Sequence, residues 1–183
     1  EISIARFGID GSMILLSMVD RTAEATSRLN LRREMLSDSL TGFCNRTGFE
    51  EEVENRLESL LESGSAKAYA IILIDLARFS RINESAGAMV GDELIITVAR
   101  RLNSRIRTNE ILCRLGGNEF ALFVQMEDET TSVRNIAQRL TDALIKPCQL
   151  SNLEIQVDCA AAAAIGSVGN DDPMDTLRHA QIA

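Results

Sequence analysis

The sequence is poor in aromatic side chains and in histidine. Its 183 residues include no tryptophan, one tyrosine and one histidine, His179. So few aromatic rings leave little with which to stack nucleic-acid bases, and one histidine argues against a histidine-based zinc site or a Ser-His-Asp triad. Acidic residues number 27 against 19 basic ones, giving a net charge of -8. Because no basic patch dominates, we expect no nucleic-acid partner.

Paired cysteines and long apolar runs are also absent. Cys44, Cys113, Cys148 and Cys159 show no CxxC spacing, which argues against zinc or thioredoxin-like chemistry. Cys113 and Cys159 lie in apolar runs, so we expect reduced core thiols. No apolar run reaches the roughly 18–20 residues of a membrane span, and the first residues lack the basic and apolar regions typical of a signal peptide. We therefore expect a cytoplasmic protein and, since Glu1 is not a natural start, a piece of a longer one.

The first 37 residues predict a hairpin followed by a helix. Apolar segments flank the turn pair Asp10-Gly11 within residues 1–20, which indicates two strands. Residues 21–37 repeat apolar side chains at near-heptad spacing, which predicts a connecting helix. That helix could pair with its copy in a homodimer, or it could pack on its own domain. Two strands cannot form a domain alone, so we interpret the hairpin as the end of an upstream module.

Helical and strand patterns alternate from Asp38 to the end. Residues 69–74 are an unbroken apolar run, typical of a central strand covered on both faces. Residues 111–115 and 120–124 predict two short strands joined as a hairpin, and the alanine-rich residues 155–165 predict a tightly packed strand. The order α-β-α-α-β-β-α-β-α predicts an α/β (α+β) fold, with a mixed central sheet flanked by helices.

Two polar features stand where such a fold places a ligand. Asp75 ends the central apolar strand, and Asn118 and Glu119 lie beside Gly116 and Gly117 at the hairpin tip. Ligands gather beyond the carboxyl ends of strands in α/β sheets, and glycine lets a backbone approach a ligand closely. The oxygen ligands at these two places could hold Mg²⁺. On spacing alone, an ordinary strand end and an ordinary turn remain the commoner explanation.

Five segments, in order, resemble the motifs of the GGDEF domain, the diguanylate cyclase family. They are residues 38–46 (DSLTGFCNR), 75–84 (DLARFSRINE), 87–94 (GAMVGDEL), 114–120 (RLGGNEF) and 165–166 (IG). The resemblance covers the chain from about Asp38 to its end. It implies the nucleotidyl-cyclase-like GGDEF fold and a place in cyclic di-GMP signalling, because the family condenses two GTP molecules into cyclic di-GMP.

The resemblance also implies roles for individual positions. Asp75 matches a metal-binding aspartate, Asn118 occupies a position that is both a metal ligand and part of the catalytic signature, and Glu119 matches the conserved glutamate beside it. The implied cofactor is Mg²⁺, bound weakly or not at all here. Asn83 and Asp92 match the pair that reads the guanine edge, although a helix cap and a first-turn acid are alternatives. The implied nucleotide-binding positions are Phe79, Asn83, Asp92, Gly116 and Gly117.

Departures from the family pattern predict a loss of activity. Asn118 stands where the family has an acid, and Ser80 stands where it usually has a phosphate-contacting lysine. An amide brings no negative charge to a metal and is a weak base, and a triphosphate needs cations. Losing one such electrostatic contact costs on the order of 10²–10³ in rate. We therefore expect a degenerate member that is inactive as a cyclase.

Two further resemblances concern regulation. The segment Arg107-Thr108-Asn109-Glu110 resembles the R-x-x-D motif of an inhibitory cyclic di-GMP site, and Arg139 matches a second arginine of that site. Arginine suits this role because its planar fork binds phosphate and guanine bidentately; solvated surface arginines are the alternative. Residues 1–20 resemble the last hairpin of a PAS-like sensor domain, with residues 21–37 as its exit helix.

These features lead to one hypothesis and two alternatives. The leading hypothesis is a GGDEF domain at residues 38–183 that binds GTP or cyclic di-GMP and regulates a neighbouring domain, such as an EAL phosphodiesterase domain. The first alternative is an active diguanylate cyclase that tolerates Asn118. The second is a structural dimerisation unit, against which the retained Asn83 and Asp92 argue.

Overall fold

The computed structural model describes residues 2–7, 13–18, 30–126, 132–151 and 153–182, and the chain divides into two units, residues 1–35 and 36–183. In the first unit, β1 (Ile2–Phe7) and β2 (Met13–Met18) pair antiparallel, with Ile2 opposite Met18. The N-terminal hairpin is thus confirmed. Its turn at 10–11 and residues 21–29 of the expected connecting helix lie outside the described residues, whereas residues 30–36 are helical.

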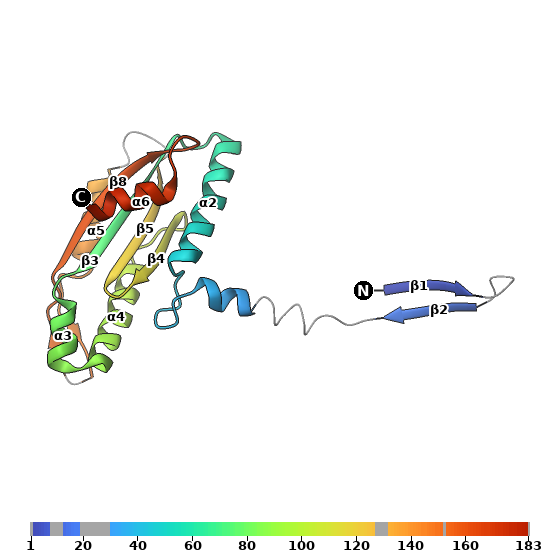
Figure 1. The fold of residues 1–183 in the computed structure, drawn as a ribbon. Helices are drawn as coiled ribbons and strands as arrows, with labels where there is room; N and C mark the ends of the chain where they lie inside the picture. Colours follow the sequence, from blue (N-terminus) through green and yellow to red (C-terminus); the bar gives the residue numbers. More distant parts are fainter. Residues whose placement is uncertain (1, 8–12, 19–29, 127–131, 152, 183) are drawn as a thin grey trace. The chain divides into compact units, whose positions relative to one another are not determined.

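A four-stranded sheet in the order β4-β5-β3-β8 forms the centre of the second unit (Figure 1). Its strands are β3 (Ala68–Leu76), β4 (Glu110–Gly116), β5 (Glu119–Met126) and β8 (Cys159–Ser167). All three neighbouring pairs are antiparallel, so the expectation of a mixed sheet is wrong in this detail. The crossover after β3 leads to β4, which is not its neighbour, and β5 returns between the two as the second strand of a hairpin.

Helices cover both faces of this sheet, as the α/β pattern predicts (Figure 1). α2 (Arg46–Ser63) and α6 (Pro173–Ile182) pack on one face, and α4 (Ala88–Asn103) and α5 (Val133–Asp142) pack on the other. α3 (Phe79–Ala86) directly precedes α4. β3 is apolar throughout because its alternate side chains enter both cores: Ile71 faces the α2–α6 side, and Ile72 the α4–α5 side.

The alanine-rich strand differs from its expectation. The predicted strand over 155–165 is divided between β7 (Glu154–Ile155), which pairs with β6 (Cys148–Gln149), and β8. Within the described residues β8 pairs only with β3. It is therefore an edge strand, with Ile165 61% exposed, and not tightly packed. Cys113 is buried as expected, and all four cysteines are free thiols.

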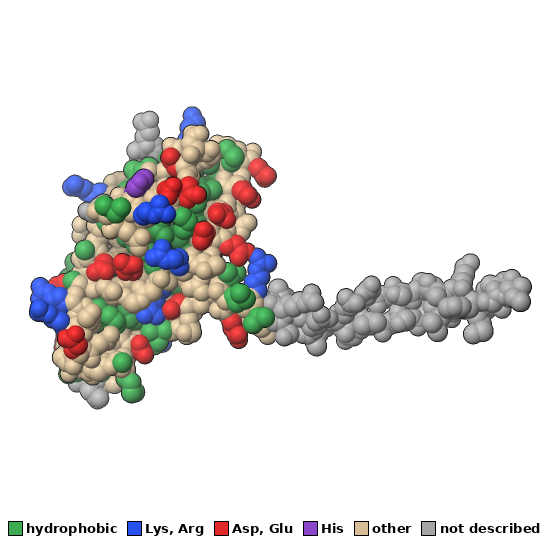
Figure 2. Space-filling model, viewed as in Figure 1, with side chains coloured by type: hydrophobic (Ala, Val, Ile, Leu, Met, Phe, Trp, Pro, Cys, Tyr) green, Lys and Arg blue, Asp and Glu red, His purple; other side chains and the backbone are tan. Residues whose placement is uncertain are grey.

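None of the helices in the described ranges has the length and apolarity needed to cross a membrane. The described surface is highly charged, and acidic side chains gather over α2 in Figure 2. That helix alone carries the run Glu50–Glu52 together with Glu54, Glu58 and Glu62.

Candidate functional site

An ion pair ties the segment before α2 to strand β4. The Asp38 carboxylate accepts hydrogen bonds from the Thr41 hydroxyl at 2.7 Å and from Arg114 Nη1 at 3.0 and 3.1 Å. The two charged side chains are only 17% and 11% exposed. Burial alone would raise the pKa of Asp38, but the hydrogen bonds from Thr41 and Arg114 outweigh it and hold that pKa below its ordinary value.

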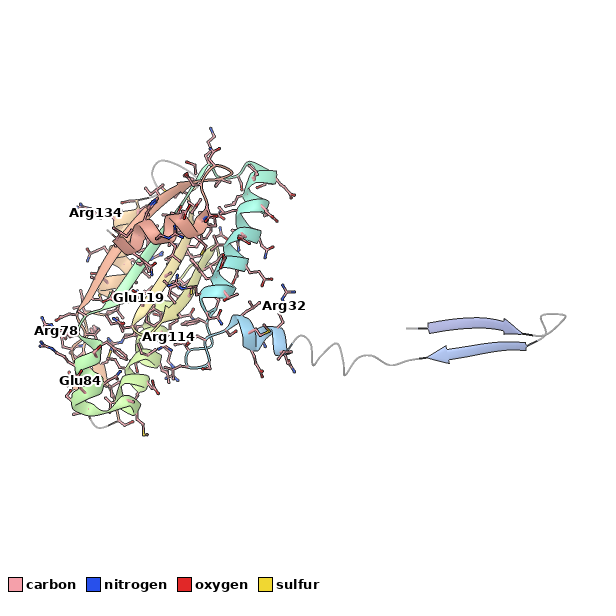
Figure 3. The ribbon with its side chains drawn as sticks, in the orientation of Figure 1. Arg32, Arg78, Glu84, Arg114, Glu119 and Arg134 are labelled. Atoms are coloured by element: carbon pink, nitrogen blue, oxygen red, sulfur yellow. The ribbon has the colours of Figure 1, made fainter. Side chains whose placement is uncertain are left out.

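Arg114 extends this connection to the turn between β4 and β5. Its Nη2 donates to the Gly117 carbonyl oxygen at 2.7 Å, and its Nε donates to the same oxygen at 3.2 Å. The turn requires glycine, because Gly116 has φ 136° and Gly117 has φ 54°. Arg114, labelled in Figure 3, thus links the β4–β5 turn to Asp38. Sequence reasoning missed this role of Arg114, since its partner Asp38 is 76 residues away.

The turn places Asn118 against the end of β3. Asn118 Nδ2 donates to Asp75 Oδ2 at 2.9 Å and to the Leu76 carbonyl oxygen at 2.8 Å. The backbones are also joined, because Leu76 N donates to Asn118 O at 3.2 Å. Glu119 lies directly opposite Asp75 in the β3–β5 ladder. The structure therefore brings together Asp75, Asn118 and Glu119, the three residues that the sequence assigns to metal binding and catalysis.

A pocket of about 290 Å³ opens beside these residues. Asp75 and Glu119 line it together with Gln181 of α6 and the small side chains of β8. Gln181 Nε2 lies 3.4 Å from Glu119 Oε2, the long limit of a hydrogen bond. The alanines of β8 thus leave open space where larger side chains would fill the end of the sheet.

The acidic groups do not fit a divalent cation in this arrangement. Among the described residues, no three His, Cys, Asp or Glu side chains are grouped so that they could hold a metal ion. Asp75 and Glu119 are two carboxylates, and the third position presents an amide N–H₂ to Asp75 in place of an oxygen. Mg²⁺ takes oxygen ligands, so a cation and this amide nitrogen cannot occupy the same place.

A second group of sequence-assigned residues lies where α3 meets α4; we call Phe79, Asn83, Gly91 and Asp92 the α3–α4 corner. A Cβ added at Gly91 would lie 1.8 Å from Asn83 Oδ1 and 3.2 Å from Phe79 Cζ. Glycine at this position is therefore what allows Asn83 to pack against α4. Asn83 Oδ1 is buried and has no hydrogen-bond partner in the described part of the chain, and Asp92, the next residue after Gly91, is exposed.

Positive charge near the start of α3 is sparse and exposed. Ser80 and Arg81 are both exposed. Arg78, labelled in Figure 3, precedes α3 in the left-handed region with φ 58°. Its side chain is 70% exposed and lies 4.0 Å from Asp158. Such an exposed pair contributes little stability, so Arg78 is a cation that a bound anion could recruit.

The residues assigned to an inhibitory site meet at the start of β4. Arg139 Nη2 donates to Glu110 Oε1 and Oε2 at 2.6 and 2.8 Å, and the Arg107 backbone N–H donates to Glu110 Oε2 at 2.9 Å. The Glu110 side chain is only 4% exposed. Arg139 Nε is buried without a described partner. The structure thus joins Glu110 to Arg139 through their side chains and to Arg107 through its backbone, while the Arg107 residue is exposed.

Comparison with known proteins identifies the family. The model of the diguanylate cyclase GGDEF domain matches residues 35–183, so the chain belongs to the GGDEF domain family, and its α/β fold is the GGDEF fold. The GGDEF domain of PA1120 (YfiN or TpbB) from Pseudomonas aeruginosa is 27% identical, with a TM-score of 0.70 over 78% of this chain and 88% of that one. The diguanylate cyclase SiaD from the same organism superposes with a TM-score of 0.72 at 21% identity, covering 89% of this chain and 62% of that one.

The curated relatives are named for different activities. The bifunctional diguanylate cyclase/cyclic di-GMP phosphodiesterase MucR of Pseudomonas aeruginosa is 27% identical over 83% of this chain, and the probable diguanylate cyclase DgcE of Escherichia coli is 33% identical over 74%. The chain spans only 23% and 12% of these two relatives. Membership places the chain in cyclic di-GMP signalling. GGDEF cyclases use Mg²⁺ generally, whereas the described residues contain no metal cluster.

Proposed function

We propose that this GGDEF domain binds a guanine nucleotide, GTP or cyclic di-GMP, without turning it over, and that it regulates a neighbouring domain. The observation that carries this proposal is the hydrogen bond from the Asn118 amide to the Asp75 carboxylate. The position that supplies an acid in the family resemblance is neutral here, and its side chain is already engaged. Without that acid, position 118 supplies neither a base nor a negative ligand for phosphoryl transfer, and only Asp75 and Glu119 remain as carboxylates.

The α3–α4 corner supports nucleotide binding. Asn83 Oδ1 is buried and has no hydrogen-bond partner among the described residues, and a buried oxygen left unpaired costs free energy. Guanine offers N–H donors along the edge that an amide and a carboxylate can read. Asn83 packs against Gly91, and Asp92 is the next residue along α4, so a base bound at this corner would lie near both residues.

Synthesis of cyclic di-GMP is the competing function. Two relatives at least 30% identical, DgcE and DgcJ of Escherichia coli, are named probable diguanylate cyclases. Glu119 and both glycines of the β4–β5 turn are retained, and these features favour turnover over a purely structural role. The cyclic di-GMP phosphodiesterases NbdA and PdeR also match, at 29% and 24% identity. Regulation of a phosphodiesterase domain, such as an EAL domain, is therefore part of the proposal.

Calorimetric titration with GTP and, separately, with cyclic di-GMP tests the proposal. We expect binding of at least one nucleotide, and no cyclic di-GMP after prolonged incubation with GTP and Mg²⁺, measured by chromatography. Product formation would instead establish the active cyclase. If neither nucleotide binds at millimolar concentration, the structural dimerisation unit is the remaining hypothesis, with dimerisation through residues 21–37 or elsewhere. The proposed nucleotide-binding roles of Asn83 and Asp92 would then be wrong.

Arg107, Glu110 and Arg139 are proposed as a separate cyclic di-GMP site. Arg139 is held by Glu110, which is almost fully buried, so its guanidinium is already oriented. Arg139→Ala should reduce cyclic di-GMP affinity by about tenfold or more and leave GTP affinity unchanged, because charge-assisted bidentate contacts are strong. Arg134→Ala, on the same helix, is the matched control. Equal cyclic di-GMP affinity in the two variants would contradict this site.

A further inference from the structure

The orientation of the Asn118 amide is determined by its neighbours. Its Nδ2 lies between two oxygens, Asp75 Oδ2 at 2.9 Å and Leu76 O at 2.8 Å. Both oxygens are acceptors only at neutral pH. Turning the amide over would place Oδ1 against two acceptors and leave no donor between them. The network therefore requires the nitrogen at this position.

This nitrogen takes the place that a cation would need. A cation bound at the end of β3 would use Asp75 Oδ2 as a ligand, and the Asn118 amide donates both to this oxygen and to Leu76 O. Mg²⁺ requires near-octahedral oxygen ligands at about 2.0–2.1 Å. To admit it, the Asn118 side chain must leave, breaking both hydrogen bonds, one of them to an ionised carboxylate. In return it could offer only a neutral amide oxygen.

The backbone makes this arrangement self-sufficient. Leu76 N donates to Asn118 O at 3.2 Å, and Arg114 holds the preceding Gly117 carbonyl at 2.7 Å. The β4–β5 turn is thus bound to the end of β3 on one side and to Arg114 on the other. No cation is needed to assemble this end of the site, because the amide protons already bridge the two oxygens.

We propose that this domain binds its guanine nucleotide independently of divalent cations, and that the Asn118 side chain is the cause of this independence. This inference rests on the proposed nucleotide binding and adds the form of the ligand: the nucleotide is recognised without a protein-bound Mg²⁺. The amide substitutes for the cation in joining Asp75 to Leu76. It does so without the positive charge that would draw a triphosphate to the catalytic geometry.

A single substitution should reverse this behaviour. Asn118→Asp replaces the donor by a carboxylate that faces Asp75 and the Leu76 oxygen. Like charges at hydrogen-bond distance repel one another, so the end of the sheet should be destabilised until a cation joins the oxygens. The variant should therefore gain a dependence on Mg²⁺ that the natural sequence lacks. Asn135→Asp makes the same change of charge at an exposed position of α5 and serves as the control.

The test is GTP affinity of the full chain at constant ionic strength, with saturating Mg²⁺ or with EDTA. For the natural sequence and for Asn135→Asp, the two dissociation constants should agree within about threefold, whereas Asn118→Asp should bind at least about tenfold more weakly in EDTA. A tenfold loss for the natural sequence on removal of Mg²⁺ would overturn the inference. Absence of binding of both GTP and cyclic di-GMP under both conditions would refute the proposed function instead.

Cation binding without nucleotide keeps the inference testable in that case. Mn²⁺ alone is titrated into each protein and followed by electron paramagnetic resonance, and melting temperatures are compared with and without Mg²⁺. Asn118→Asp should bind Mn²⁺ and melt at a higher temperature when Mg²⁺ is added. The natural sequence should behave like Asn135→Asp in both measurements. Mn²⁺ binding by the natural sequence as tight as that of Asn118→Asp would overturn the inference.

Discussion

The two halves of the candidate site satisfy their polar groups in opposite ways. At the end of the sheet, Asn118 donates a hydrogen bond to Asp75 of β3, and the turn that carries Asn118 is held by Arg114. At the α3–α4 corner, Asn83 Oδ1 is buried and finds no hydrogen-bond partner in the part of the chain that the structure describes. A ligand therefore has a hydrogen bond to complete at the corner, while at the end of the sheet it must compete with bonds already made. Under the proposed function, the base would be recognised at the corner, while the end of the sheet keeps its own hydrogen bonds.

Gly91→Ala should have the largest effect, because it damages the corner directly. The new Cβ would lie 1.8 Å from Asn83 Oδ1, forcing Asn83 or the helix to move. We expect a loss of about 1–3 kcal/mol in the free energy of unfolding, the usual cost of overpacking. Guanine-nucleotide affinity should fall at least about tenfold. Chemical denaturation and calorimetric titration measure the two effects.

Gly48→Ala provides the matched control for this variant. Its Cβ would lie 2.1 Å from the Leu36 carbonyl oxygen, so it too should destabilise the domain. Since Gly48 lies in α2, its nucleotide affinity should remain at the level of the natural sequence. If Gly48→Ala lost affinity as strongly as Gly91→Ala, the loss would reflect general destabilisation and the corner would not be the binding site.

Asp38→Asn tests the ion pair with Arg114 that supports the β4–β5 turn at the end of the sheet. The carboxylate loses its charge-assisted bonds to Arg114 and Thr41, and we expect about 1–2 kcal/mol less stability at neutral pH, discounted for partial exposure. Burial raises the native pKa of Asp38, but the hydrogen bonds from Thr41 and Arg114 lower it by more. The net result is a native pKa below the ordinary value of 3.8. Its stabilisation is therefore complete above pH 3.8 and is lost as the pH falls through the native pKa.

The measurement is urea unfolding of both proteins across the acid range. The difference in the free energy of unfolding between the natural sequence and Asp38→Asn should become smaller below pH 3.8. Asp175→Asn removes the exposed ion pair with Arg178, whose side chains are 57% and 68% exposed, and should cost less than about 0.5 kcal/mol. A gap for Asp38→Asn that stays constant with pH would show that the ionised carboxylate is not what stabilises the β4–β5 turn.

Ser80→Lys should have the smallest effect and partly restores the phosphate side. Ser80 is exposed at the start of α3, so a lysine there can reach a bound triphosphate without repacking. We expect GTP affinity to rise about two- to fivefold, as for an exposed ion pair, with guanosine affinity unchanged. Ser85→Lys, on the same helix and also exposed, should leave both affinities as they are. An equal gain for guanosine would mean that the lysine does not contact phosphate.

Much of the fold could be predicted, because its signals are local. The apolar run that became β3, the glycines of the β4–β5 turn and the helical periodicities each report the conformation of their own segment. The edge position of β8 and the antiparallel order could not be predicted, since both depend on which strands become neighbours. A run of alanines looks the same in the sequence whether its strand is buried in the sheet or lies at an edge beside a pocket.

The candidate site shows the same difference between local signals and long-range contacts. Which chemical groups are available can be read from the sequence: an amide at 118 where the resemblance implies an acid, a serine at 80, and Asn83 and Asp92. How those groups contact one another depends on the tertiary structure. The pairing of Asn118 with Asp75, of Arg114 with Asp38 and of Arg139 with Glu110 joins residues 43, 76 and 29 positions apart. Such contacts arise from the packing of β3, β4, β5 and α5, and no local pattern encodes them.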